Sequence, residues 1–345
     1  MKLGSLFDGS GGFPLGGIIA GITPVWSSEI EPFPIRVTEK RLPQMKHYGD
    51  VSKLSGENIE PVDVITFGSP CQDMSVAGKR AGLDGARSGL FLQAVRIIKE
   101  MRAKYQKPRF IVWENVRGAL SSAGGDDFRR VLEEICNVKK SDVSVPKPEK
   151  WNSGGLIMGD DFSVAWRVLD AQYWGVPQRR KRIYLVADFD GDSAGKILFE
   201  SEGVSGHFEK MQAARKDFAR TTQNGAGETG WGKEVLNDQG GMLVLFDNHS
   251  QDSRYNGPLK LSPSLNTQLG TGGNNAPLVC VPTSADNLYL MSKSYHFTHA
   301  TPDQADALVA TDYKSPPVVN ADWRVRMITP LECARLQGFP DWWTD

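Results

Sequence analysis

Short β-rich runs alternate with helical patterns along the first part of the chain, and this alternation limits the fold more than any other feature. The runs cover residues 3–7, 24–28, 62–67, 110–113 and 182–187. Between the third and fourth runs, residues 88–104 place apolar side chains on one face of a helix. Strands that alternate with helices in this way build βαβ units and a mostly parallel sheet. We therefore expect residues 1–190 to form an α/β domain with helices on both faces of the sheet.

The character of the sequence changes after residue 190. From 191 to 320, glycines and Asn-Gly and Gly-Gly turn signals are scattered, and long helical faces are few. This composition predicts a second, smaller domain that is rich in loops and contains β-strands. We expect the last segment, 321–345, to return to the first domain.

Composition excludes several classes of protein. Of the 345 residues, 40% are apolar and 23% charged, as in an ordinary soluble protein. No run approaches the ~18 apolar residues of a membrane-spanning helix, and the first residues lack a signal-peptide pattern, so we expect a cytoplasmic protein with no membrane partner. The four cysteines lie far apart without a CxxC pair, which predicts neither a zinc site nor a disulfide framework. Because the net charge is −1, any contact with nucleic acid must come from local basic clusters.

A glycine-rich turn follows the first run. The segment 7–12, Phe-Asp-Gly-Ser-Gly-Gly, lets the chain turn tightly and lets a ligand approach the backbone at a helix N-terminus. Glu29 lies twenty residues beyond Gly9, a spacing that suits contact with a ribose. Asp50 has a carboxylate able to accept from an adenine amino group, although a turn-forming aspartate explains the same residue equally well. Because the glycines follow Gly-x-Gly-Gly and not Gly-x-Gly-x-x-Gly, S-adenosylmethionine fits better than a nicotinamide dinucleotide.

A cysteine lies just past the carboxyl end of a predicted strand. Cys71 follows the apolar run 62–67 and the small step Gly68-Ser69, where backbone N–H groups can favour a thiolate. Glu114 ends the fourth run in the same way, and beside Cys71 it would protonate a ring nitrogen while the thiolate attacks the ring. Taken singly, a buried unreactive cysteine and a solvated glutamate are the ordinary alternatives.

A basic run leads into the fifth strand. Gln178 is followed by Arg179, Arg180, Lys181 and Arg182, and alternation along a strand would place Arg180 and Arg182 on the same side. One side would then meet a base and the other phosphate. A basic run is more often a solvated face, but this one enters an apolar strand.

Taken in order, these segments resemble the motifs of the DNA cytosine-5 methyltransferases. The resemblance rests on 7–12, Glu29, Asp50, 68–72, 114–116, 178–182 and 326–340, and it covers residues 1–189 and 322–345. It implies a Rossmann-like, S-adenosylmethionine-dependent methyltransferase fold, with 191–320 as a target-recognition domain. Duplex DNA is the implied partner, and a companion endonuclease of a restriction-modification system is compatible with it.

The resemblance also implies a role for each matching residue. Cys71 would add to C6 of a cytosine flipped out of the duplex, and Glu114 would engage N3 while C5 takes the methyl group. The implied set is Cys71, Glu114, Arg180 and Arg182 for catalysis; Phe7, Gly9, Gly11, Glu29, Asp50, Pro70 and Leu90 for the cofactor; and Gln72, Asn115 and Gln178 for the substrate. Residues 75–87 resemble the mobile loop that closes over the flipped base. No metal is implied.

One departure from the family concerns the end of the sequence. Family members have a final motif with a Gly-Asn pair, on a helix that returns to the first glycine loop, whereas this sequence stops at Asp345. A truncated product, a second chain that supplies the helix, and a pocket closed in another way would each explain this difference. Truncation is the favoured explanation.

Other functions fit the sequence less well. A tRNA cytosine-5 methyltransferase would keep the same residues, but its recognition segment is usually compact, whereas 191–320 comprises 130 residues. A non-catalytic DNA-binding subunit would not need the full catalytic set. A nicotinamide-dependent oxidoreductase is disfavoured by the glycine spacing.

Overall fold

The computed structural model describes strands and helices in two units of the chain. The first unit comprises residues 1–170 and 181–226, and the second comprises 171–180 and 227–345. The described residues are 1–69, 89–174, 178–199, 244–248, 255–259, 262, 265, 278–282, 289–291, 300–302, 318–320, 323–327 and 330–343. The domain boundaries expected at 190 and 320 stay predictions.

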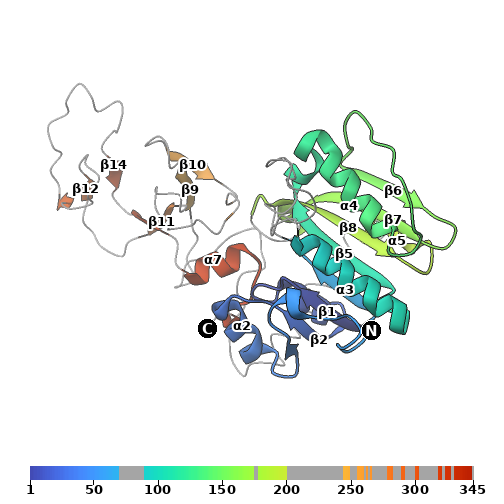
Figure 1. Cartoon of the computed structure of the whole chain (residues 1–345). Helices are drawn as coiled ribbons and strands as arrows, with labels where there is room; N and C mark the ends of the chain where they lie inside the picture. The colour runs from blue at the N-terminus through green and yellow to red at the C-terminus, as the bar shows by residue number, and fades with distance from the viewer. Residues whose placement is uncertain are drawn as a thin grey trace. The chain divides into compact units, whose positions relative to one another are not determined.

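Eight strands form one sheet in the first unit (Figure 1). The strands are β1 (Lys2–Leu6), β2 (Thr23–Ser28), β3 (Lys46–His47), β4 (Val64–Phe67), β5 (Phe110–Val116), β6 (Gly154–Met158), β7 (Ser163–Asp170) and β8 (Lys181–Asp188). Their order across the sheet is β3-β2-β1-β4-β5-β8-β7-β6, and the first five in this order are parallel. The expected Rossmann-like α/β fold is confirmed.

The other end of the sheet differs from a parallel arrangement. β8, which contains the predicted run 182–187, pairs antiparallel with β5 and β7, and β7 pairs antiparallel with β6. The connection between β6 and β7 explains their antiparallel pairing, because residues 159–162 contain no crossover helix. β6 and β7 are joined by a short turn in which the Gly159 N–H donates to the Phe162 carbonyl at 2.8 Å, and short turns bring consecutive strands together antiparallel. The sequence patterns did not identify β6 and β7.

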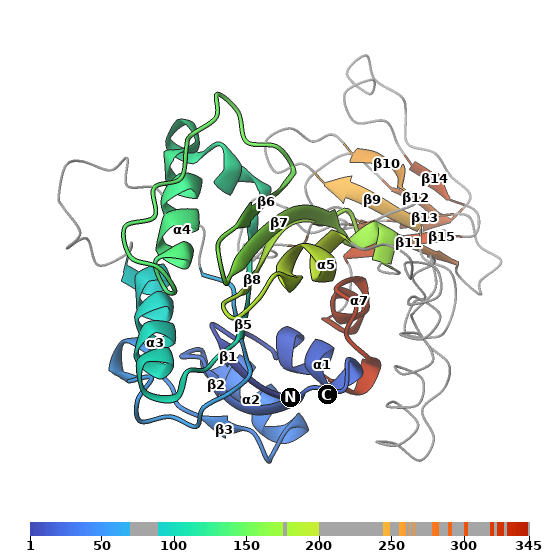
Figure 2. The same cartoon turned by 90° about the vertical axis from the view of Figure 1, so that its right-hand side faces the viewer.

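Helices cover both faces of this sheet, as expected. In Figure 2, α3 (Gly89–Tyr105) and α4 (Asp126–Cys136) lie on one face, and α1 (Gly12–Ile19) and α5 (Ser193–Phe199) lie on the other. A further helix, α2 (Pro32–Arg41), connects β2 to β3. The predicted apolar face of α3 is buried, since Phe91, Ala94, Ile97, Ile98 and Met101 are each at most 6% exposed. Within the described residues, no helix has the length and apolar character needed to cross a membrane.

Aromatic rings connect the core to the end of β4. Phe91, Trp113, Phe128 and Trp166 form a continuous series with ring centroids 6.1, 6.4 and 5.6 Å apart. Trp113 on β5 is fully buried, and its indole N–H donates to the Ser69 hydroxyl at 3.2 Å. The core therefore fixes the backbone just before Pro70.

The second unit contains two small antiparallel sheets. β9 (Val244–Asn248), β10 (Tyr255–Leu259), β11 (Leu278–Pro282) and β15 (Trp323–Met327) form one, in the order β10-β9-β11-β15. β12 (Tyr289–Met291), β13 (Ala300–Pro302) and β14 (Val318–Asn320) form the other, in the order β13-β12-β14. α7 (Pro330–Leu336) is followed by a helical turn, Asp341–Trp343, and Arg335 joins the two by two hydrogen bonds of 2.7 Å to Asp341. The β content expected of this part is confirmed.

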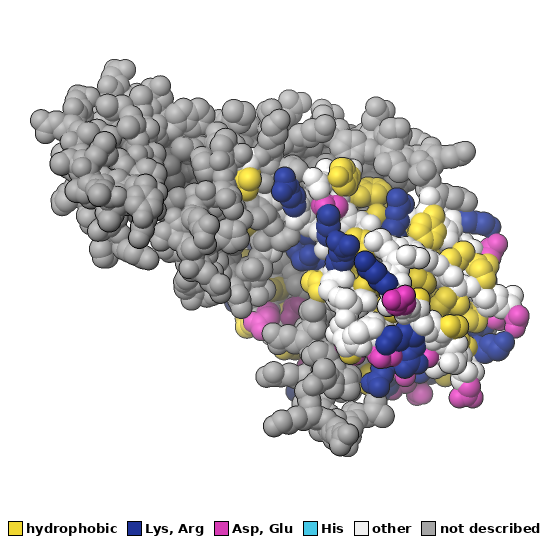
Figure 3. Space-filling view, turned by 90° about the horizontal axis from the view of Figure 1, so that it is seen from above, with side chains coloured by type: hydrophobic (Ala, Val, Ile, Leu, Met, Phe, Trp, Pro, Cys, Tyr) yellow, Lys and Arg dark blue, Asp and Glu magenta, His cyan; other side chains and the backbone are white. Residues whose placement is uncertain are grey.

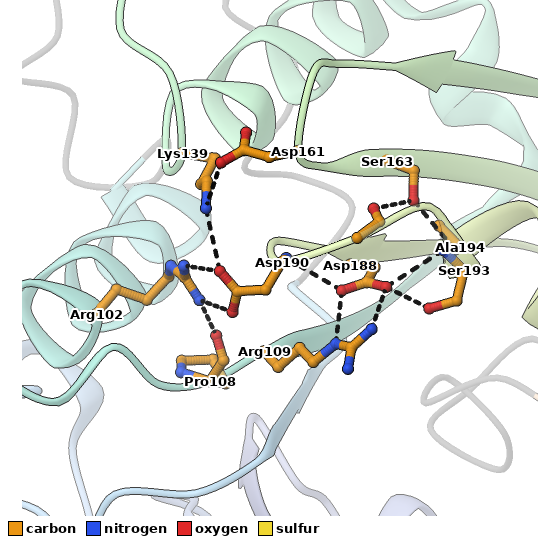
Figure 4. Close-up of polar contacts among 11 residues, drawn as sticks. Arg102, Pro108, Arg109, Lys139, Asp161, Ser163, Asp188, Asp190, Ser193 and Ala194 are labelled. Carbon is orange, nitrogen blue, oxygen red and sulfur yellow. Dashed lines mark hydrogen bonds and ion pairs between the residues drawn. The ribbon is translucent and has the colours of Figure 1, made fainter.

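A buried carboxylate fastens the end of β8 to neighbouring elements (Figure 4). The Asp188 side chain is fully buried and accepts bonds from Nε and Nη2 of Arg109, both 2.9 Å long. The Ser193 hydroxyl and N–H also donate to it. Burial by itself would raise the pKa of Asp188, but these bonds hold that pKa well below its usual range. The carboxylate therefore ties β8 to β5 and to the start of α5.

Replacing this carboxylate should destabilise the first unit. Asp188→Asn keeps the shape but removes the charge that Arg109 and Ser193 contact, so we expect the free energy of unfolding at pH 7 to fall by about 2 kcal/mol. A group whose pKa is lowered by folding stabilises the protein above its unfolded pKa of about 4 and loses that effect as the pH falls. The deficit of the variant should therefore shrink in acid, as measured by urea unfolding followed by tryptophan fluorescence.

Asp192→Asn is the matched control for this prediction. The Asp192 side chain is 65% exposed and contacts Lys196 at 3.1 Å. Exposed pairs of this kind contribute little, so the control should stay within about 0.5 kcal/mol of the unchanged protein. Equal losses in both variants would contradict the role assigned to Asp188.

Candidate active site

The carboxyl ends of β1 and β4 lie side by side where the strand order reverses. From β1 the chain continues to β2 and β3 on one side, and then crosses to β4 and β5 on the other. Leu6 pairs with Phe67 and Phe67 pairs with Trp113, so β1 and β4 end at the same level, and β5 continues beyond them to Val116. Open α/β sheets bind ligands at such a switch point. The loops after β1, β2, β4 and β5 therefore define the candidate site.

The loop after β1 has a backbone shape that favours glycine. Phe7, Gly9 and Gly11 have φ angles of 56°, 54° and 82°, and Gly11 caps the N-terminus of α1. Left-handed values suit glycine, whereas a bulky residue such as Phe7 adopts them with strain. A Cβ built on Gly9 would meet no atom within 4 Å. The loop therefore leaves open space beside its backbone at a helix N-terminus.

Glu29 holds this loop against the end of β2. The Gly9 N–H donates to Glu29 Oε2 at 2.8 Å, and the N–H groups of Ile30 and Glu31 donate to Oε1 at 2.7 and 3.0 Å. A carboxylate can accept about four hydrogen bonds. Glu29 is therefore fixed in orientation and keeps capacity on Oε2 for a ligand hydroxyl, as the predicted contact with a ribose requires.

Asp50 is fixed in a similar way near the end of β3. Its Oδ1 accepts from the Ser52 N–H at 2.9 Å and from the Ser52 hydroxyl at 2.8 Å, which caps the helical turn Val51–Lys53. These two bonds, the backbone bond first, lower the pKa of Asp50. The preceding residue is held too, because the Ser28 hydroxyl donates to the Gly49 carbonyl at 2.5 Å. Asp50 thus forms the turn that was one of its two predicted roles, and its contact with an adenine amino group stays a prediction.

Two buried side chains of β5 hold the backbone at the end of β4. The Asn115 amide donates to the Ser69 carbonyl at 3.4 Å, and Trp113 donates to the Ser69 hydroxyl. Asn115 is 5% exposed, and its Oδ1 accepts from the Val116 N–H at 2.7 Å. The amide is therefore engaged within the protein, which makes Asn115 a positioning residue for the segment that begins at Pro70. The sequence patterns did not predict the hydrogen bond between Trp113 and Ser69.

Glu114 and Arg182 meet across the pair β5–β8. Glu114 lies opposite Tyr184 in the register, and Arg182 is two residues away on the same face of the sheet. Arg182 Nε lies 3.5 Å from Glu114 Oε1, and the two side chains are 18% and 22% exposed. The structure thus brings together two predicted catalytic residues at the carboxyl end of β5. This contact depends on the antiparallel pairing of β8 with β5.

Gln178 and Arg180 belong to the second unit, whereas Arg182 belongs to the first. Gln178 is fully buried and forms an isolated bridge with Ser262, whose carbonyl accepts from the Arg179 N–H at 2.9 Å. Arg180 precedes β8, so alternation along that strand does not govern where its side chain lies. The sequence expectation that Arg180 and Arg182 share one side stays a prediction.

Several predicted residues lie outside the described part of the chain. These are Pro70, Cys71, Gln72 and the loop 75–87. Leu90 is described, and it lies half-buried at the start of α3, packed against the core. Among the described residues, no group of three or more histidine, cysteine, aspartate or glutamate side chains could hold a metal ion.

Asp8 is a residue of this site that the sequence patterns did not single out. It is 6% exposed, and within the described part of the chain neither carboxyl oxygen has a hydrogen-bond partner. Burial raises the pKa of Asp8 to about 7; the nearby Ser5 hydroxyl opposes the rise, and the charge of Glu29 adds to it. Ser5 is not positioned for a hydrogen bond of normal geometry with Asp8. Its place inside the glycine motif was visible in the sequence, but its lack of partners was not.

These observations fit the predicted cofactor. An open glycine loop, an orientated glutamate and an ionised aspartate follow the carboxyl ends of β1, β2 and β3, respectively. The unpartnered Asp8 carboxyl adds a polar group that a ligand with hydrogen-bond donors would satisfy. S-adenosylmethionine has a ribose, an adenine amino group and an ammonium group, so its chemistry matches this set of acceptors.

Comparisons with known proteins identify the family of this chain. The chain matches the family model described as C-5 cytosine-specific DNA methylase over residues 1–139 and 157–344. It is 31% identical to a protein of Escherichia phage P1 named DNA N-6-adenine-methyltransferase, over 93% of this chain and 50% of that protein. It is 25% identical to the type II methyltransferase M1.ScrFI of Lactococcus lactis subsp. cremoris, over 99% of this chain and 69% of that protein.

A solved structure supports the fold. A protein described as a DNA modification methyltransferase, encoded within a prophage of E. coli, matches 99% of this chain and 90% of its own, with a TM-score of 0.51 and 18% sequence identity. This likeness concerns the fold alone.

The fraction of each relative's length that this chain covers differs from one relative to the next. The chain spans half the length of the phage P1 relative and a third of the length of the type II methyltransferase M.NgoBV of Neisseria gonorrhoeae. The name of the phage P1 protein refers to adenine, whereas the family model refers to C5 of cytosine. Because that model matches nearly all of the sequence, the chain belongs to the C-5 cytosine-specific DNA methylase family, whose methyl donor is S-adenosyl-L-methionine.

Proposed function

We propose that this chain transfers a methyl group from S-adenosylmethionine to C5 of a cytosine in a specific sequence of duplex DNA. The observation that carries the proposal is the contact of Glu114 with Arg182 at the end of β5. The adjacent β4 leads through Ser69 to Pro70 and Cys71. A thiol, a carboxyl group and a guanidinium group on neighbouring strand ends are what activation of a cytosine ring requires.

The cofactor would lie against the loops after β1, β2 and β3. We assign Phe7, Gly9 and Gly11 to the open loop, Glu29 to the ribose and Asp50 to the adenine amino group. Pro70 and Leu90 complete the predicted set. When bound, S-adenosylmethionine supplies an electrophilic methyl group.

The chemistry then follows from the protein side chains. The Cys71 thiolate forms a bond to C6, which moves the electron pair of the C5–C6 double bond to C5, and Glu114 donates a proton to N3 to stabilise that charge. C5 would use the electron pair to take the methyl group that bound S-adenosylmethionine supplies. A base then removes the proton from C5, N3 returns its proton to Glu114, and the returning electron pair expels the thiolate. Arg182, in contact with Glu114, orientates the carboxyl group, and Gln72 and Gln178 are assigned to the flipped base and the DNA.

Local charge favours a DNA partner despite the net charge of −1. Viewed from above, Lys and Arg side chains form a band across the described surface of the molecule (Figure 3). Such bands contact phosphates without regard to sequence. We assign recognition of the target sequence to residues 191–320, and a companion endonuclease is in keeping with the type II relatives.

Analysis of methylated nucleosides tests this proposal. The purified chain is incubated with S-adenosylmethionine and mixed-sequence duplex DNA, and the DNA is digested and analysed by mass spectrometry. We expect 5-methylcytosine, because ring activation by a thiol delivers the methyl group to C5. An absence of methylated DNA from a chain that binds S-adenosylhomocysteine would contradict the proposal.

The name of the phage P1 relative makes adenine N6 the second candidate target. Transfer to an exocyclic amine needs no attack by a thiol on the ring, so Cys71 would have no role in it. N6-methyladenine without 5-methylcytosine in the same digest would establish this alternative. tRNA as a parallel substrate tests the RNA-directed alternative, and we expect no product from it.

Glu114→Gln should slow methyl transfer strongly. The amide keeps the size of the side chain but cannot donate the acidic proton or pair with the charge of Arg182, so we expect the rate to fall at least about 100-fold. The affinity for S-adenosylhomocysteine should change less than about twofold, because Glu114 lies near the end of β5 and outside the cofactor loops. Single-turnover transfer and calorimetric binding measure the two effects.

Glu149→Gln is the matched control for Glu114. Glu149 is an exposed glutamate between α4 and β6, and its replacement should leave both the transfer rate and the affinity unchanged. If Glu114→Gln transfers methyl groups at the normal rate, Glu114 has no part in the mechanism.

A further inference from the structure

An open edge of the first sheet carries exposed apolar side chains. β6 is the last strand in the order of that sheet and pairs with β7 on one side (Figure 1). Its Leu156 and Met158 are 46% and 55% exposed. On α5, Ile197 and Phe199 are 54% and 36% exposed. We call these four residues the β6–α5 patch.

Two members of the β6–α5 patch, Leu156 and Phe199, lie where the strand and the helix meet. A Cβ built on Gly195 of α5 would lie 3.3 Å from Cδ1 of Leu156, and one built on Gly154 of β6 would lie 3.3 Å from Cε1 of Phe199. The helix and the strand therefore touch through these two glycines. Leu156 and Met158 lie on the same face of β6, because side chains alternate along a strand. Leu156 and Phe199 thus border the contact between strand and helix, and Met158 extends the apolar face of β6 at the edge of the sheet.

The hydrogen bonds of β6 show which of its backbone groups are open. The Gly159 N–H donates to the Phe162 carbonyl at 2.8 Å, and the Val168 N–H donates to the Ser153 carbonyl at 2.7 Å. Hydrogen-bonded residues alternate in an antiparallel pair, so the odd-numbered residues of β6 bond to β7. The even-numbered residues direct their N–H and C=O groups to the open side, where the described part of the chain provides no partner strand. They are Gly154, Leu156 and Met158.

This edge lacks the usual protection against another strand. Proteins commonly place lysine, proline or a bulge at an exposed edge, but β6 reads Gly-Gly-Leu-Ile-Met and pairs with β7 in an unbroken register. The family match omits residues 140–156, which include the first part of β6. An open apolar edge outside the shared family pattern is suited to bind another strand.

We propose that β6 pairs with β6 of a second copy of this chain, antiparallel and centred on Leu156, to form a symmetric dimer. A two-fold axis makes this surface complementary to itself. Leu156 then lies opposite Leu156 of the partner subunit, and Met158 lies opposite the partner's Gly154. Because glycine leaves room, the Met158 thioether can contact the partner's Phe199, which borders that glycine. The inference concerns assembly and is independent of the proposed function.

Charges beyond the ends of β6 favour the same arrangement. Lys150 is exposed before the strand, and the Asp160 side chain after it is 89% exposed, with a contact to Lys140 at 3.1 Å. Antiparallel pairing about Leu156 brings Lys150 of one copy toward Asp160 of the other at both ends. A parallel pairing would place like charges together, which is unfavourable. The strand that fits the open edge of β6 in both register and charge is therefore β6 of a second copy.

Light scattering and sedimentation of the whole chain test the dimer. We expect the mass to rise with protein concentration from 38.0 kDa toward twice that value. Met158→Lys should hold the mass at 38.0 kDa across the same range, because a lysine on each copy brings charge into the apolar contact. Phe33→Lys is the matched control: Phe33 is also 54% exposed but lies on α2, so this variant should dimerise like the unchanged chain.

Hydrogen exchange distinguishes strand pairing from other contacts. In the unchanged chain, the Leu156 and Met158 amides should exchange at least about tenfold more slowly at high than at low concentration, because pairing occupies them. The measurement needs no variant, so a folding defect in Met158→Lys would not affect it. A chain that stays monomeric into the micromolar range, or a dimer in which these amides exchange as fast as in the monomer, would overturn the proposal.

Discussion

The site depends on the hydrogen bonds that hold the loop after β1 against the end of β2, where the Phe7 N–H donates to the Ser28 carbonyl at 2.9 Å. The Gly9 N–H donates to Glu29 across the ends of β1 and β2, and Glu29 is itself held by two further backbone N–H groups. A hydrogen bond to a charged group is worth about 1.5–3 kcal/mol net, enough to hold a strained loop in one shape. Phe7 has a positive φ in that loop, which is tolerated only where the surroundings determine the backbone. The same carboxylate therefore shapes the loop and, in the proposed function, contacts the ribose of the cofactor.

The second half of the site is held by the core. Trp113 is packed among aromatic rings and fixes Ser69 by a hydrogen bond, while Asn115 fixes the Ser69 carbonyl. β5 thus carries groups with two uses: Trp113 and Asn115 position the end of β4, and Glu114 between them meets Arg182. A change in the core near Trp113 would consequently alter the position of Ser69, which precedes Pro70 and Cys71. Because side chains alternate along a strand, Trp113 and Asn115 lie on one face of β5 and Glu114 lies on the other.

Much of this arrangement could be predicted from the sequence, where periodicity or spacing is strong. The long apolar face of 88–104 predicted α3, and the twenty residues between Gly9 and Glu29 predicted that the two would serve one site. β6 was not predicted, because a short strand with a Gly-Gly start has weak alternation, and β7 was not predicted because apolar and polar residues do not alternate along Ser163–Asp170. The contact of Glu114 with Arg182 was not predicted either, since it depends on the antiparallel register of β8, which the connection after β7 decides. The lack of partners around Asp8 is a property of packing, which a motif does not record.

Calorimetric binding of S-adenosylhomocysteine to Glu29→Gln and Glu31→Gln tests the central claim most directly. Glutamine offers one acceptor oxygen to three N–H donors, so Glu29→Gln leaves donors unpaired and loosens the loop; Glu31 is exposed and serves as the matched control. We predict a loss of affinity of at least about tenfold for Glu29→Gln, equivalent to 1.4 kcal/mol, and no change for Glu31→Gln. If folded Glu29→Gln binds as tightly as the unchanged chain, the cofactor does not lie against the Gly9–Glu29 loop pair, and the account of the site is wrong.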